Sequence, residues 1–192
     1  MQRVYVLAVA VLLLVAPTAH AGLVGAKFDA VYYYQDATTP YSDATFSNPT
    51  FTVGPGVETM LDVEKLTQMS VDFTNDTLTI DYLSTTATPP KWGGFPINGP
   101  TFTLTPGTSP TSLGIVGFSI AGTTLAGFDA GRVTYDDTRI SINWSDLTYA
   151  AGDKVVVTFA FVPEPSSIIA LGVGCALPVV AGLRRRRRRT EA

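Results

Sequence analysis

The side chains that could carry out chemistry in this chain are mainly aspartates near predicted turns. The sequence has one histidine, His20, and one cysteine, Cys175. Neither lies between residues 22 and 162, so that region cannot hold a Ser-His-Asp triad, a Cys-His pair or a histidine-ligated metal. Carboxylates remain as candidates around two predicted hairpins. Asp72, Asp76 and Asp81 lie around one hairpin, and Asp136 and Asp137 around the other.

These aspartates have three interpretations. A pair of carboxylates can hydrolyse a glycosidic bond. Aspartate and backbone oxygens can also bind calcium, although the stretch 72–76 lacks the twelve-residue loop with its closing glutamate. Aspartate is, in addition, a common turn residue that accepts hydrogen bonds from its own backbone. We favour the turn interpretation and predict no catalytic residue and no cofactor. Structural calcium and a carboxylate-dependent glycan hydrolase are the alternatives.

Aromatic residues offer a second kind of site. Tyr32, Tyr33 and Tyr34 are consecutive, so in a strand at least one of them must point outward. Trp92 lies in a stretch rich in glycine and proline and could likewise stack against a sugar ring. Packing in the core of the domain is the alternative for all four residues.

The C-terminal end contains three segments in series. The first is Pro163-Glu164-Pro165, where the two prolines favour an extended backbone. The second is the apolar run Ile168–Leu183, whose sixteen residues would span about 24 Å as a helix, against about 30 Å for a bilayer core. The third is a block of six arginines, Arg184, Arg185, Arg186, Arg187, Arg188 and Arg189.

The arginine block predicts the orientation of this tail. Carrying six arginines across a bilayer would cost on the order of 15 kcal/mol, so we expect them to stay in the cytoplasm with the preceding residues outside. Nucleic-acid binding by the arginines, or permanent anchoring by the apolar run, are the alternatives.

These residues and their order resemble the PEP-CTERM sorting signal of exported bacterial surface proteins. The resemblance covers about residues 163–192, with Pro163, Glu164 and Pro165 at the recognised tripeptide. It implies that an exosortase, a membrane-embedded cysteine protease, processes the chain. It also implies a transient inner-membrane intermediate held by residues 168–183, followed by release to the cell surface or the extracellular matrix.

The N-terminal end predicts export as well. Arg3 is followed by the unbroken apolar run Val4–Val15 and then by small residues that include Ala19 and Ala21. This order is typical of a secretory signal peptide, with cleavage after Ala21. An uncleaved membrane anchor is the alternative.

The region between the two ends is acidic. Residues 22–162 contain six basic and fourteen acidic residues, which gives a net charge of −8. Such a surface repels nucleic acid and anionic lipid, so we expect no nucleic-acid partner.

Short alternating segments predict strands throughout residues 22–162. Two hairpins stand out, around the turn 74–76 and around Asp136-Asp137. Residues 36–49 are expected to form a loop, Val57–Leu66 a short helix, and Leu113–Ile120 a strand that is either buried or bulged. Other strands are expected at Phe28–Tyr34, Pro49–Val53, Thr101–Leu104 and Lys154–Phe161.

The sequence thus predicts an all-β protein with three parts. Residues 1–21 form a signal peptide, residues 22–162 a single β-sandwich of the jelly-roll or immunoglobulin-like kind, and residues 163–192 the sorting signal. We expect a structural or adhesive surface protein that binds polysaccharide and is not an enzyme.

Overall fold

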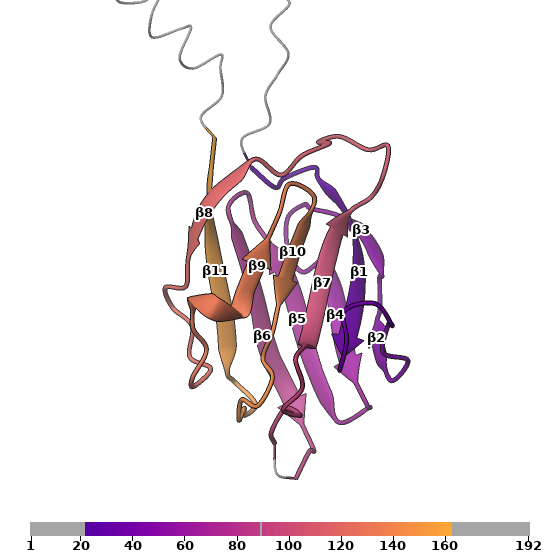
Figure 1. Ribbon diagram of the computed structural model, residues 1–192, viewed down its shortest axis with the longest axis vertical. Helices are drawn as coiled ribbons and strands as arrows, with labels where there is room; N and C mark the ends of the chain where they lie inside the picture. The colour runs from indigo at the N-terminus through magenta and orange to yellow at the C-terminus, as the bar shows by residue number, and fades with distance from the viewer. Residues whose placement is uncertain (1–21, 89, 163–192) are drawn as a thin grey trace, which may run out of the picture. The chain divides into compact units, whose positions relative to one another are not determined.

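The structure, a computed structural model, describes residues 22–88 and 90–162, which form one compact unit of the chain. The predicted signal peptide, sorting tripeptide, apolar run and arginine block lie outside the described residues. Within them, two antiparallel sheets pack face to face as a β-sandwich (Figure 1). The helical structure described is a single 3₁₀ turn, η1 (Ala130–Arg132). None of the described helices has the length and apolarity needed to span a membrane.

The predicted all-β architecture is therefore confirmed. The five-stranded sheet has the order β3 (Thr50–Thr52), β1 (Lys27–Tyr34), β7 (Asn98–Leu104), β10 (Arg139–Ile142) and β9 (Val133–Tyr135). The six-stranded sheet has the order β2 (Ala44–Phe46), β4 (Thr59–Val63), β5 (Thr67–Phe73), β6 (Thr77–Thr85), β11 (Lys154–Phe161) and β8 (Ile115–Ser119).

Both predicted hairpins are present. In the β5–β6 hairpin Val71 lies opposite Ile80 and Phe73 lies opposite Leu78, and all four side chains are fully buried. In the β9–β10 hairpin the turn is closed by the Asp136 amide, which donates to the Arg139 carbonyl oxygen at 2.9 Å. Alternation of apolar and polar residues directs one face of each strand into the core.

The predicted helix at Val57–Leu66 is wrong. Its central residues form β4, in which Thr59, Leu61 and Val63 are buried while Met60 and Asp62 lie on the other face. The period of two decides the outcome, because β4 pairs with β2 on one side and β5 on the other.

Two other predictions need adjustment. The expected loop at 36–49 contains the short edge strand β2, which pairs with β4. The segment Leu113–Ile120 forms β8 at the opposite edge of the same sheet, with Val116 exposed and a register shift opposite Ala160 and Phe161. The bulged alternative is thus the correct one.

Phenylalanine side chains join the two sheets. Phe73 of the six-stranded sheet meets Phe102 of the other sheet edge to face, with ring centroids 5.1 Å apart, and stacks on Phe28 at 5.3 Å. All three rings are fully buried. Because residues 22–162 are a compact unit with a core of this kind, we expect them to fold independently.

Truncating Phe102 tests this core. Phe102→Ala removes contacts across both sheets and should lower the free energy of unfolding by about 3–5 kcal/mol. Thr103→Ala, on the outward face of the same strand, should change it by less than about 0.5 kcal/mol. Urea unfolding of residues 22–162 measures both values. Equal losses would contradict the placement of Phe102 in the core and of Thr103 on the outer face of β7.

Candidate functional site

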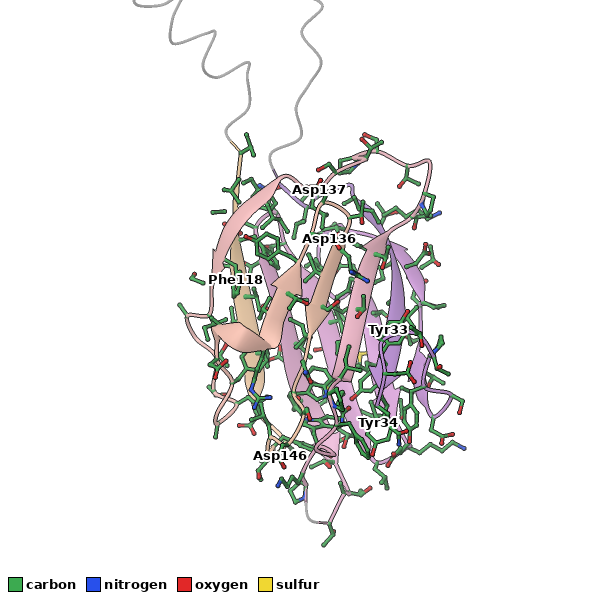
Figure 2. All side chains as sticks on the ribbon, viewed as in Figure 1. Tyr33, Tyr34, Phe118, Asp136, Asp137 and Asp146 are labelled. Carbon is green, nitrogen blue, oxygen red and sulfur yellow. The ribbon has the colours of Figure 1, made fainter. Side chains whose placement is uncertain are left out.

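One end of the sandwich contains a pocket of about 330 Å³. It lies where β1 ends and where the β4–β5 turn and the loop after β6 converge, at the end marked by Tyr34 in Figure 2. Aromatic, aliphatic and polar residues share its wall. We call this site the aromatic pocket. Its aromatic residues are Tyr32, Tyr34, Tyr41, Trp92 and Tyr149.

A buried chain of hydrogen bonds forms part of the pocket floor. Trp144 Nε1 donates to the Tyr32 hydroxyl at 2.8 Å, and this hydroxyl donates to Asn98 Oδ1 at 2.6 Å. Asn98 Nδ2 in turn donates to the carbonyl oxygen of Gly93 at 3.2 Å. Burial raises the pKa of Tyr32 well above its usual value, so its phenol stays protonated and keeps its role as a donor.

Trp92 belongs to this floor. Its ring stacks on Trp144 and on Tyr149, with centroid distances of 5.2 and 4.6 Å, and its Nε1 donates to the Tyr82 hydroxyl at 3.1 Å. Only 6% of the residue is exposed. Trp92 therefore supports the pocket and does not offer the open stacking face that its loop position suggested.

The three consecutive tyrosines point in alternate directions, as predicted for a strand. Tyr32 is buried, Tyr33 lies on the outer face of the sheet, and Tyr34 lines the pocket (Figure 2). The half-buried Tyr34 ring contacts the rings of Tyr41 and Phe95 at centroid distances of 4.9 and 4.7 Å. Tyr34 and Tyr41 are thus the pocket aromatics with the most accessible ring surface.

The loop before Tyr41 is held by an aspartate. The Asp36 carboxylate accepts hydrogen bonds from the Thr38 hydroxyl and from the amides of Thr38 and Thr39, which lowers its pKa to about 2. The Tyr41 amide then donates to the carbonyl oxygen of Tyr32 at 2.9 Å. These bonds place the Tyr41 ring beside the pocket.

Glu64 contributes a carboxylate from the β4–β5 turn. The Tyr41 hydroxyl donates to Glu64 Oε1 at 2.5 Å, and burial together with this bond raises the pKa of Tyr41. The turn is closed by the Leu66 amide on the Val63 carbonyl oxygen at 3.0 Å. Glu64 and Lys65 have φ angles of 58° and 57°, the left-handed region that asparagine and glycine favour in such turns. Two residues that fit this conformation poorly therefore stand in the turn beside the pocket, and such backbone strain is common at functional sites.

Lys91 also lines the pocket and is paired. Its Nζ atom is 2.6 Å from Asp146 Oδ1, and this hydrogen bond and charge lower the pKa of Asp146. The lysine charge is thus balanced locally, whereas the Glu64 carboxylate is bonded to a neutral phenol.

The aspartates predicted from the sequence lie elsewhere. Asp72 and Asp76 belong to the β5–β6 hairpin of one sheet, and Asp136 and Asp137 to the β9–β10 hairpin of the other. Figure 2 shows Asp136 and Asp137 at the end of the sandwich opposite Tyr34.

Two of these aspartates bond within their own turns. Asp76 accepts from the hydroxyls of Thr74 and Thr77, and Asp136 accepts from the Thr138 amide, which lowers the Asp136 pKa. Among the described residues no group of three histidine, cysteine or acidic side chains is placed to hold a metal ion. Calcium binding at these positions stays a prediction, which calorimetric titration with Ca²⁺ would test.

Sequence reasoning missed Tyr41, Glu64 and Tyr149. They come from a loop, a turn assigned to a helix, and a second loop, and none belongs to a local motif.

Comparison of the chain with models of known families, with curated proteins and with solved structures gives no match. The geometry of the aromatic pocket is therefore the main indication of function within the described residues.

The strained turn gives a testable prediction. Lys65→Gly removes the steric cost of a left-handed residue and should raise the free energy of unfolding by about 1 kcal/mol. Lys65→Ala removes the same charge but keeps a Cβ atom, so it should leave stability nearly unchanged. Urea unfolding of residues 22–162 compares the two variants. A larger gain for alanine than for glycine would contradict the strain.

Proposed function

We propose that the chain is an exported surface or extracellular-matrix protein whose β-sandwich binds polysaccharide in the aromatic pocket. The observation that carries this proposal is the accessible pair of rings, Tyr34 and Tyr41, beside the hydrogen-bonding groups of Glu64 and Thr88. Sugar rings have apolar faces that stack on aromatic rings and hydroxyls that need polar partners. The volume of about 330 Å³ lies at the lower end of the range for small-molecule sites, which suits one or two sugar units.

Binding fits the pocket better than hydrolysis. A two-carboxylate glycosidase needs a pair of acidic residues on either side of the scissile bond. Among the described residues that line the pocket, Glu64 is the one carboxylate. We therefore propose a non-enzymatic, structural or adhesive role.

The route to the surface rests on the two ends of the chain. The proposal takes residues 1–21 as a cleaved signal peptide and residues 163–192 as a PEP-CTERM sorting signal that an exosortase recognises at Pro163–Pro165. The short apolar run 168–183 and the arginines that follow it would hold the chain in the inner membrane until processing.

The finer fold assignment is also a proposal. The chain changes sheet seven times within the described strands, at β1–β2, β2–β3, β3–β4, β6–β7, β7–β8, β8–β9 and β10–β11. Crossovers of this kind between two antiparallel sheets are typical of Greek-key sandwiches, which include the jelly-roll and immunoglobulin-like folds.

Neighbouring tyrosines provide a matched test of polysaccharide binding. Tyr34→Ala removes a pocket ring and should weaken binding about tenfold, whereas Tyr33→Ala removes the same side chain from the outer face and should not. A panel of bacterial polysaccharides is screened with residues 22–162, and the affinity of each variant is then measured by calorimetry. Equal losses for the two variants, or no binding by the wild-type domain, would contradict the proposed site.

The sorting proposal has its own test. Replacing Pro163, Glu164 and Pro165 with alanine should block processing, so the mature protein in exosortase-containing cells keeps Arg184–Arg189. Ser166→Ala with Ser167→Ala leaves the tripeptide intact and should be processed normally. Mass spectrometry of the C-terminal peptide distinguishes the two. Loss of the arginines in the tripeptide variant would argue against recognition at that motif.

A further inference from the structure

The aromatic pocket adjoins a second hollow, and the two share side chains. The second hollow has a volume of about 320 Å³ and, like the pocket, is lined by Tyr41 and Glu64. Asp43, Asp62 and Lys65 also line it. We call it the acidic hollow. Because Tyr41 and Glu64 line both, the pocket and the hollow are neighbours on the surface of the domain.

The charge of this combined surface is negative. Three carboxylates, those of Asp43, Asp62 and Glu64, line the hollow together with one cationic side chain, Lys65. The Lys91 ammonium in the aromatic pocket is already paired with Asp146 Oδ1 at 2.6 Å. Among the ion pairs of the described residues, none involves these three carboxylates. Nearby acidic groups also act on Tyr41, whose pKa is raised further by the charges of Glu64 and Asp43. A ligand in this position therefore meets a local excess of negative charge.

The aromatic rings beside Glu64 also favour a positively charged ligand. The face of a tyrosine ring carries negative charge density and attracts ammonium groups that approach within about 6 Å of its centre. Tyr34 and Tyr41 lie with centroids 4.9 Å apart, and the Tyr41 hydroxyl is bonded to the Glu64 carboxylate. A single ammonium group at the pocket mouth could thus contact two rings and one carboxylate.

We propose that the aromatic pocket and the acidic hollow together bind a cationic polysaccharide, a chain of amino sugars whose amines are free. One sugar unit stacks on Tyr34 and Tyr41 with its ammonium toward Glu64, and the next units run past Asp43 and Asp62. This inference rests on the proposed function, because it names the substrate class of the same pocket. It excludes uronic-acid polymers, whose carboxylates would face those of the hollow.

Three matched oligosaccharides test the inference. Residues 22–162 are titrated calorimetrically with glucosamine tetramer, N-acetylglucosamine tetramer and galacturonic acid tetramer, in a buffer acidic enough to keep the glucosamine amines protonated. The glucosamine tetramer should bind about tenfold more tightly than its acetylated counterpart, and its affinity should fall as salt is added. The galacturonate tetramer should bind most weakly.

Two carboxylate variants assign the effect to this site. Glu64→Gln keeps an acceptor for the Tyr41 hydroxyl but removes the charge, so it should abolish most of the preference for the glucosamine tetramer. Its affinity for the acetylated tetramer should hardly change. Asp137→Asn removes one charge at the opposite end of the sandwich and should leave the preference intact (Figure 2). Urea unfolding confirms that both variants fold.

The outcomes separate this inference from the proposed function. Equal affinity for the glucosamine and acetylated tetramers, or an unchanged preference in Glu64→Gln, would overturn the cationic ligand while leaving a neutral polysaccharide site in place. Failure of all three tetramers and of the wider polysaccharide panel would overturn both.

Discussion

At one end of the sandwich, large aromatic residues are buried together with their polar atoms, and the fold depends on hydrogen bonds between these atoms. The sandwich encloses Trp144 and Tyr32 almost completely, so the indole nitrogen and the phenol cannot be satisfied by water. They bond to one another, and the phenol bonds to Asn98, at distances of 2.8 and 2.6 Å. An unpaired group at this depth would cost about 1–3 kcal/mol. The chain therefore ties β1, the start of β7 and the segment after β10 into one rigid unit.

That rigidity prepares the pocket above it. Trp92 stacks on both Trp144 and Tyr149. The loop that carries it is fixed further by Ser145, whose hydroxyl donates to the carbonyl oxygen of Phe95 at 2.6 Å. The accessible rings Tyr34 and Tyr41 then rest on a floor whose side chains have little freedom. A ligand would not have to order these groups on binding, which removes one of the main costs of association.

The sequence predicted the strands far better than the pocket, for a physical reason. In the β5–β6 hairpin, apolar and polar residues alternate along each strand. This local pattern is enough to predict that Val71, Phe73, Leu78 and Ile80 are buried. In Val57–Leu66 the same alternation is short and bordered by Glu64 and Lys65, which are good helix formers, and pairing with two neighbouring strands overrides that preference. Tyr41, Glu64 and Tyr149 meet only because loops distant in sequence converge at one end of the sandwich. No pattern within any one loop carries that information.

The negative charge that a ligand meets depends on the carboxylates close to it. A net charge of −8 over residues 22–162 suggests general attraction to cations, but at physiological salt a charge is screened over about 8 Å. Asp136 and Asp137, at the far end of the sandwich in Figure 2, therefore contribute little to a ligand beside Tyr34. Glu64, Asp43 and Asp62 are the carboxylates that line the shared surface next to the accessible rings. Selectivity for a charged polysaccharide would thus depend on these few side chains, and in particular on the turn that holds Glu64 in an unfavourable backbone conformation.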